Sequence, residues 1–319
     1  MNKRILLWGL IAFVFISCRK EFKIDYPELS PTLVVNCLFT HDSIFNIQVS
    51  RLTVLNDNST DTIIRNAKLT LYENGTFFDL AQYNSQLGFY QSTKTAQAGN
   101  SYRLTVEAEG FPVATASDKL PDTLFIDSTN LYCSAYYDSW QNQHYDKVEL
   151  FFSEPAPDNY YEIFTFTHKY YEYEGESENI YTIPTEMTSF DPIILSEGIL
   201  DEEKYRPSLV FSDNLLANNA EVNFLTCTGV SGTSFPPDGY TVLRNVSKNY
   251  YLFRKQWYKY LDTNGAAEMS GMAQFANMSF VASPLEAYTN VENGLGIFAG
   301  YIQTEKLMTV KTESSKTVF

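Results

Sequence analysis

Short stretches in which apolar and polar residues alternate recur through the first third of the chain. A period of two residues places the apolar side chains on one face of a β-strand, so the pattern predicts strands. One stretch runs into Asn74-Gly75, which supplies the positive φ angles that a tight hairpin turn needs. Short strands separated by frequent turns are typical of a β-sandwich, which we expect over residues 29–121. The clearest stretches are 32–38, 45–50, 67–72, 102–108 and 113–117.

The remainder of the chain reads as a second β-rich region over residues 122–319. Lys119-Leu120-Pro121-Asp122 separates it from the first, because proline and charged residues end the strand pattern there. Residues 170–179 are acidic and aromatic without a period, and they predict an exposed loop or a hairpin tip. The strands expected in this region are 147–152, 160–167, 208–211, 221–225, 240–243 and 306–310.

One helix is expected, from Ser247 to Leu261. Ser247 can cap its first turn, and Asn264-Gly265 can end it. Helical spacing places an aromatic and apolar stripe on one face. The stripe is Tyr250, Phe253, Trp257, Tyr260 and Leu261. The predicted fold is therefore mainly β, with two β-sandwich-like regions and one amphipathic helix near residues 248–262.

Residues 1–17 have the pattern of a signal peptide. Lys3 and Arg4 precede an uncharged apolar run that ends at Ser17-Cys18. The run is too short to cross the ~30 Å hydrocarbon core of a membrane as a helix. A small residue at 17 and a thiol at 18 suit cleavage before Cys18 and attachment of a diacylglycerol and a palmitate to it. The alternative is an ordinary secretion signal with an incidental cysteine. Residues 18–28 then form the lipid anchor and a charged tether.

Charge narrows the range of partners. The chain has a formal net charge of −15, and removal of Lys3 and Arg4 with the signal makes it −17. An acidic chain repels phosphate backbones, so nucleic acid is not expected as a partner. The abundance of aromatic residues, with 23 Tyr and 23 Phe, agrees with the predicted β-structure.

Three cysteines follow Cys18. Cys37 lies in an apolar strand pattern and is expected to be a small core residue. Cys133 and Cys227 could form a disulfide, but no disulfide framework is visible in their spacing, which favours unpaired and buried thiols.

Two resemblances accompany these patterns. The segments around Asn66–Leu71, Gly88–Tyr90 and Gly99–Val106 are similar to immunoglobulin-like or transthyretin-like domains of exported proteins, which implies a scaffold or spacer. Over nearly the whole mature chain, the sequence resembles the family of Bacteroidota lipoproteins catalogued as domain of unknown function 4249. The segments that carry this second resemblance are Ser17-Cys18, Pro31–Asn36, Gln48–Arg51, Asn66–Leu69, Ser101–Leu104, Phe211–Asp213, Ser247–Tyr251 and Asn290–Phe298.

The most specific part of that resemblance is the signature Asn293, Gly294, Gly296 and Phe298, to which we assign a structural role. Cys37 departs from the family pattern, in which glycine is expected. The family resemblance implies an outer-membrane lipoprotein, often encoded near a TonB-dependent transporter. It implies no chemistry and no active-site residues.

Several catalytic and ligand motifs are incomplete. The glycines of 294–300 alternate with Leu295, Ile297 and Phe298 as in a strand, so they do not form the strand–turn–helix unit of a nucleotide site. Gly229–Thr233 lacks the second glycine of a nucleophile elbow. His41, His144 and His168 lack the spacing of a metal pair. We therefore expect no cofactor, no metal and no enzymatic activity.

A tyrosine cluster is the best candidate for a partner-binding surface. Tyr170, Tyr171 and Tyr173 offer large rings with hydroxyl groups at low entropic cost, which suits protein, peptide or sugar partners. The alternative is a hairpin that packs on its own sandwich. The leading hypothesis is a lipid-anchored, non-catalytic accessory of a TonB-dependent uptake system, on either face of the outer membrane. The alternatives are a structural or adhesion module and, last, a hydrolase with an unrecognised site.

Overall fold

The structure is a computed structural model that describes residues 30–53, 61–139, 142–153, 158–173, 176–200, 205–216, 219–226, 239–265 and 288–311. Side chains of 168–181 and 263–265 are not part of that description. Contacts group Pro31–Leu52 with Ser59–Phe319 in one compact unit. Met1–Ser30 with Thr53–Asn58 form the other unit, which lies almost wholly outside the described residues.

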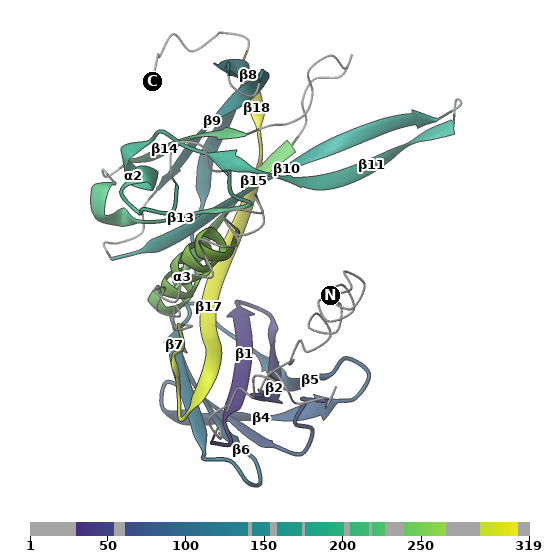
Figure 1. Ribbon diagram of the computed structural model, residues 1–319, viewed down its shortest axis with the longest axis vertical. Coiled ribbons are helices and arrows are strands. Elements are labelled where there is room, and N and C mark those ends of the chain that lie inside the picture. Colours follow the sequence, from purple (N-terminus) through teal and green to yellow (C-terminus); the bar gives the residue numbers. More distant parts are fainter. Residues whose placement is uncertain are drawn as a thin grey trace, which may run out of the picture. The chain divides into compact units, whose positions relative to one another are not determined.

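The protein is mainly β, as predicted, and its strands form two mixed sheets (Figure 1). The larger sheet has the order β11-β10-β15-β17-β1-β2-β5-β4-β3-β6-β7-β16, with β13 paired to β10. The smaller has the order β12-β14-β9-β8-β18. The predicted helix is α3 (Lys248–Gly265). The structure also contains a short helix, α2 (Pro192–Leu195), and a 3-10 turn, η1 (Asp213–Leu215), and the sequence pattern predicts neither of them.

The strands of the N-terminal region follow the predicted alternation. In β1 the residues facing inward are buried and the others are partly exposed. Asn74 and Gly75 have φ values of 49° and 81°, as the Asn-Gly turn requires. The strands are β1 (Leu33–Thr40), β2 (Ile44–Arg51), β3 (Lys68–Glu73), β4 (Thr76–Asn84), β5 (Phe89–Thr95), β6 (Ser101–Glu107) and β7 (Ala114–Lys119).

The C-terminal region supplies the rest of both sheets. Its strands are β8 (Ile126–Asp138), β9 (Gln143–Ser153), β10 (Tyr160–Tyr173), β11 (Glu176–Thr185), β12 (Met187–Thr188), β13 (Leu209–Ser212), β14 (Asn219–Thr226), β15 (Gly239–Val246), β16 (Val291–Glu292), β17 (Gly294–Leu307) and β18 (Thr309–Lys311). Of these, β8 is an element that the sequence pattern does not predict.

Strand β17 connects the two regions. Its first half pairs in parallel with β1, from Leu33↔Gly294 to Thr40↔Tyr301. Its second half pairs antiparallel with β15, from Val246↔Tyr301 to Tyr240↔Leu307. The hydrogen-bonded ladder therefore crosses the boundary predicted at residues 121–122, and the division at that point stays a prediction.

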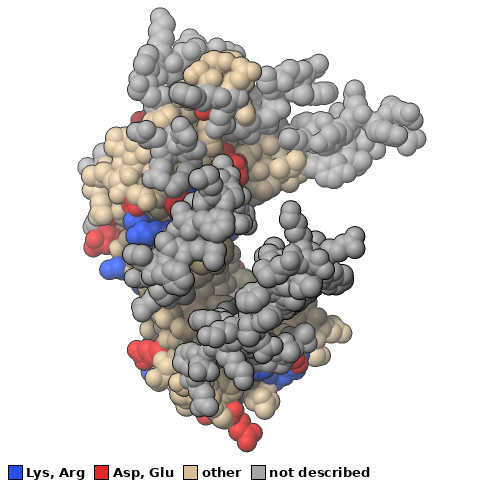
Figure 2. Space-filling model, in the orientation of Figure 1, with Lys and Arg blue, Asp and Glu red and all other residues tan. Residues whose placement is uncertain are grey.

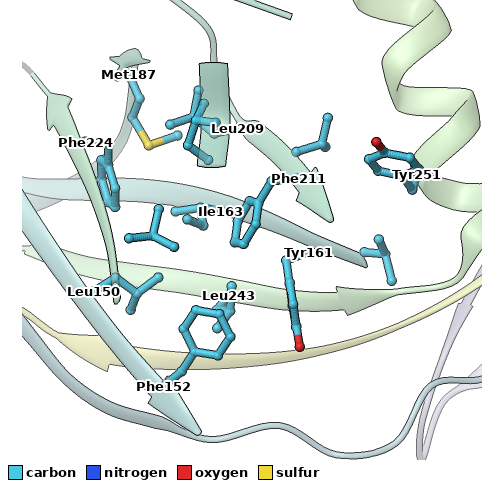
Figure 3. Close-up of a cluster of buried hydrophobic side chains, with 14 of the residues drawn as sticks. Leu150, Phe152, Tyr161, Ile163, Met187, Leu209, Phe211, Phe224, Leu243 and Tyr251 are labelled. Carbon is cyan, nitrogen blue, oxygen red and sulfur yellow. The ribbon is translucent and has the colours of Figure 1, made fainter. Parts of the chain in front are cut away.

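Two hydrophobic cores fill the interior. The N-terminal core gathers the rings of Phe39, Phe45, Tyr102 and Phe298, with Phe39 and Phe298 centroids 4.7 Å apart. The C-terminal core lies between the two sheets, where Leu150 and Phe152 of β9 and Phe224 of β14 face Ile163 of β10 and Leu243 of β15 (Figure 3). Burial of apolar area of this kind is the main stabilising contribution to the fold.

Candidate functional site

Helix α3 packs on the larger sheet through the buried carboxylate of Glu162 in β10. The side chain of Glu162 has no exposed surface. Its Oε1 accepts from Arg254 Nε at 2.8 Å and from Ser208 Oγ at 2.6 Å, and its Oε2 accepts from the Tyr250 hydroxyl at 2.5 Å. Burial first, and then the charge of Glu162, raises the pKa of Tyr250. Since both oxygens already have partners, this cluster serves to hold the helix.

Two aromatic rings enclose the Arg244 guanidinium next to this cluster. Its central carbon lies 4.5 Å from the ring centroid of Phe164 and 4.5 Å from that of Tyr301. Arg244 Nη1 also donates to the Tyr250 hydroxyl at 2.9 Å. Arginine suits this position because its planar group can stack and donate hydrogen bonds at the same time.

A second buried carboxylate, Glu197, holds the neighbouring stripe of α3. Its Oε1 accepts from the Ser212 backbone N–H at 2.7 Å, and its Oε2 accepts from Lys255 Nζ at 2.8 Å and from the Tyr251 hydroxyl. Burial alone would raise the pKa of Glu197, but the hydrogen bonds from Lys255, Tyr251 and Ser212 lower it below its ordinary value. Glu197 is therefore charged in the folded protein at neutral pH.

The helix and its Ser247 cap are present as predicted, and the aromatic and apolar stripe is divided between buried and exposed positions. Ser247 Oγ accepts from the Tyr250 backbone N–H at 3.2 Å. Tyr250 and Tyr258 are buried, whereas Trp257 is 44% exposed and Tyr260 47% exposed. The buried carboxylates of Glu162 in β10 and of Glu197, in the turn after α2, bind Arg254 and Lys255, and this turns a mixed polar and tyrosine face inward.

The family-signature residues lie where β16 turns into β17 and then runs beside β1. Asn293 has φ 56° in the turn. A Cβ on Gly294 would lie 3.0 Å from Leu33 O, and one on Gly296 would lie 2.1 Å from Val35 O. Phe298 is fully buried among the rings of the N-terminal core. The glycines thus allow close approach of the β1 backbone.

Asn290 fixes the start of this segment. Its Oδ1 accepts from the Phe298 backbone N–H at 3.0 Å, and its Nδ2 donates to the Phe298 carbonyl at 2.7 Å. A side-chain amide that makes both bonds replaces a paired strand residue.

Tyr170, Tyr171 and Tyr173 lie in a β-hairpin and not in an irregular loop. The hairpin pairs Tyr170 with Ile180, Tyr171 with Asn179 and Tyr173 with Glu176. Among the described residues, strand β15 pairs with β10 as far as Thr167, which lies opposite Gly239. Beyond that point the described part of the hairpin is a two-stranded ribbon (Figure 1).

The predicted anchor residues Ser17 and Cys18 lie outside the described residues, as do Cys227 and Gly229–Thr233. Cys37 is buried in the core, where burial raises the pKa of its thiol. Cys133 is a free thiol but is exposed, so the prediction that it is buried is wrong. The reason is that the outer half of β8 extends past the core.

The histidines and the charged surface give no metal cluster in the described ranges. His41 Nε2 lies 3.1 Å from Asp42 Oδ2, and the ring of His144 lies 4.8 Å from that of Tyr137. No group of three or more His, Cys, Asp or Glu side chains among the described residues is arranged to hold a metal. On the face shown in Figure 2, described acidic and basic residues lie in small separate groups.

A polar pocket of about 540 Å³ is the candidate ligand site. Three segments line it, which lie between Asp118 and Asp122, between Asp158 and Tyr160, and from Asn245 to Lys248. The pocket therefore lies where β7 ends, β10 begins and β15 leads into α3. Its volume is in the ~300–1,000 Å³ range of small-molecule sites.

The sequence pattern does not predict this pocket, because the three segments are far apart along the chain. Two of these segments have a recognisable sequence pattern, the boundary at Lys119–Asp122 and the helix cap at Ser247. Each pattern predicts a feature of the fold and not a ligand site.

Comparisons with known proteins give a family and little else. No curated protein matches the chain. A solved structure described as "Putative membrane anchored protein from Corynebacterium diphtheriae" shares 12% identity with a TM-score of 0.21, covering 68% of this chain. The chain spans about half of that protein, 54% of its length, and a likeness of this size carries no argument about function.

None of the helices in the described part of the chain has the length and apolar character to cross a membrane. The family described as "Domain of unknown function (DUF4249)" matches residues 19–307, which is most of the sequence and includes all of the signature residues. The chain belongs to the DUF4249 family.

Proposed function

We propose that the chain is a lipid-anchored, non-catalytic accessory component of a TonB-dependent uptake system in the outer membrane. Cys18 carries the lipid, and the distal part of the β10–β11 hairpin contacts the transporter. The Ser17-Cys18 pattern at the end of an apolar signal supports the anchor. The buried carboxylates Glu162 and Glu197 support a non-catalytic role, because both accept hydrogen bonds from side chains of α3 and so hold the helix in place.

The β10–β11 hairpin is the main structural support for a partner-binding surface. A two-stranded ribbon is at best marginally stable in water, and a strand at a sheet edge offers unpaired backbone groups to another chain. β11 ends the strand order of the described sheet, and the ribbon continues beyond Thr167 without β15. A binding partner that pairs with β11 or covers the ribbon would stabilise the ribbon and provide hydrogen-bond partners for its edge.

The composition of the ribbon favours a protein partner. Tyr170, Tyr171 and Tyr173 belong to the residue type that most often supplies binding energy at interfaces. Glu172, Glu174, Glu176 and Glu178 stand against Lys169 in the same segment, so the ribbon is acidic and suits a basic partner surface.

A pull-down from native membranes tests the proposal. The triple variant Tyr170→Ala, Tyr171→Ala, Tyr173→Ala is expected to weaken recovery of the transporter more than tenfold. The control variant Phe77→Ala, Phe125→Ala removes two exposed rings elsewhere, which are 57% and 71% exposed, and is expected to recover as much as the wild type. Equal recovery with all three proteins would exclude the tyrosines from the contact.

The alternative, a structural or adhesion module, predicts that no transporter is recovered with any bait. Fractionation tests the anchor separately. Cys18→Ala is expected to move the protein from the membrane to the soluble envelope fraction. Membrane retention of that variant, with no acyl group on the wild type, would contradict the anchor.

A further inference from the structure

Asn245, one of the residues that line the polar pocket, carries a buried hydrogen-bond acceptor without a donor. Asn245 is 1% exposed, and its Nδ2 donates to the backbone carbonyl of Asp122 at 3.0 Å. A carbonyl can only accept, so this bond assigns the amide orientation and identifies the other atom as Oδ1. In the described structure that oxygen has no hydrogen-bond partner. A buried acceptor left unpaired destabilises the fold, and a ligand that supplies a donor would remove this penalty.

Asp118 adds a negative charge to the same pocket. Its Oδ2 accepts from the Gly300 backbone N–H at 2.8 Å, and its Oδ1 accepts from Asn249 Nδ2 at 2.9 Å. Burial raises the pKa of Asp118, although hydrogen bonds from Ser247, Gly300 and Asn249 favour the charged form. These partners are all uncharged, so a cation in the pocket would stabilise the carboxylate.

Charges of both signs surround the opening. Asp122 and Asp158 line the pocket as exposed carboxylates, and Lys119 and Lys248 line it as exposed amines. No ion pair joins these four residues in the described structure. The lining thus combines acceptors on the more buried Asn245 and Asp118 with exposed groups of both charges.

We propose that this pocket binds a small molecule through a protonated primary amine, with Asn245 Oδ1 and the carboxylates of Asp118, Asp122 and Asp158 as its acceptors. An ammonium group has three donors and a positive charge, and so satisfies the orphaned amide oxygen and the carboxylates together. The pocket lies at the start of β10, whereas the ribbon begins after Thr167, and the proposal does not depend on the transporter contact.

Calorimetric titration of the full mature protein with two matched probes tests the amine requirement. Glucosamine carries a protonated amine where glucose carries a hydroxyl group, and the two are otherwise alike. Glucosamine is expected to bind at least tenfold more tightly than glucose. Equal binding of the two sugars, or binding of neither, would overturn the proposal.

Variants then test the location. Asp122→Asn and Asp158→Asn keep the side-chain shape, and Asn tolerates the φ of 70° at position 158. Each is expected to weaken glucosamine binding several-fold, and the pair more than tenfold. Glu109→Gln neutralises an exposed carboxylate that does not line the pocket, and its affinity is expected to equal that of the wild type. Unchanged binding by the double variant would overturn the assignment to this pocket.

Discussion

Arg254 Nε donates a hydrogen bond of 2.8 Å to Oε1 of Glu162, whose side chain is completely buried. This pair joins α3 to β10 and lies at the centre of the cluster that includes Ser208, Tyr250 and Tyr258. A buried ion pair contributes little in net terms compared with apolar packing, but it is costly to break from one side. The pair therefore determines which face of α3 meets the sheet.

Removal of one partner of this pair is expected to be strongly destabilising. Arg254→Met leaves the buried Glu162 carboxylate with Arg244, whose Nη1 lies 3.5 Å from its Oε2, as the remaining cation. We expect a loss of about 3 kcal/mol in the free energy of unfolding. The double variant Glu162→Leu, Arg254→Met removes both charges and is expected to lose much less. Urea unfolding at neutral pH measures both. Arg65→Met, which breaks the exposed Arg65–Asp61 pair, is the control and is expected to unfold close to the wild type.

The Glu197 carboxylate predicts a specific pH dependence of stability. Its pKa is lowered in the folded state, so the protein gains stability from it above the ordinary pKa of 4.5 and loses that stability as the pH falls through the lower folded value. Glu197→Gln removes this contribution. The difference in unfolding free energy between wild type and variant is expected to be constant from pH 7 to about 5 and to shrink in more acidic solution. A constant difference down to pH 3 would contradict the pKa assignment.

The glycines of β17 predict a sharp contrast between two Gly→Ala substitutions. A Cβ at Gly296 meets Val35 O at 2.1 Å, whereas one at Gly88 meets nothing within 4 Å, and both residues have positive φ. Gly88→Ala therefore measures the conformational cost alone, about 1–2 kcal/mol. Gly296→Ala adds the clash and is expected to lose more than ~3 kcal/mol or to prevent folding. Similar melting temperatures for the two variants would show that β1 can move away.

Adjacent residues of α3 test its observed orientation. Tyr258 is 1% exposed and Trp257 is 44% exposed. Tyr258→Ala is expected to cost about 3–5 kcal/mol, as for a buried ring. Trp257→Ala loses the exposed stack on Tyr260 and is expected to cost about 1 kcal/mol. Thermal unfolding distinguishes the two, and the reverse order would contradict the observed orientation of α3.

The strands were predictable because alternation is a local property. β2, β3 and β6 match the alternating stretches within a residue or two. The orientation of α3 could not be predicted in the same way, because it depends on Glu162 and Glu197, which are far away in the sequence. Helical spacing places Tyr250 and Trp257 on one stripe, but it does not show that the contacts of Arg254 and Lys255 with the buried carboxylates leave Trp257 exposed.

The pocket and the length of β8 are two further features that the sequence pattern does not predict. Asp118, Asp158 and Asn245 come from three segments that meet only after β17 has joined the two regions. No spacing rule links such residues, and a single Asn next to a helix cap carries no visible signal. Cys133 was expected to be buried for a similar reason, since the sequence does not show how far β8 extends beyond the core.

The parallel pairing of β1 with β17 has a mechanical consequence. If Cys18 carries the lipid as proposed, a pull from the membrane enters the described structure on the N-terminal side of β1. From Leu33↔Gly294 to Thr40↔Tyr301, the interstrand hydrogen bonds lie across that direction and share the load. Separation of the strands then requires the bonds to slide past one another together instead of opening one by one. The same ladder passes the force through β17 to β15 and β10, so β1 and the β10–β11 hairpin lie at opposite ends of one continuous force-bearing path.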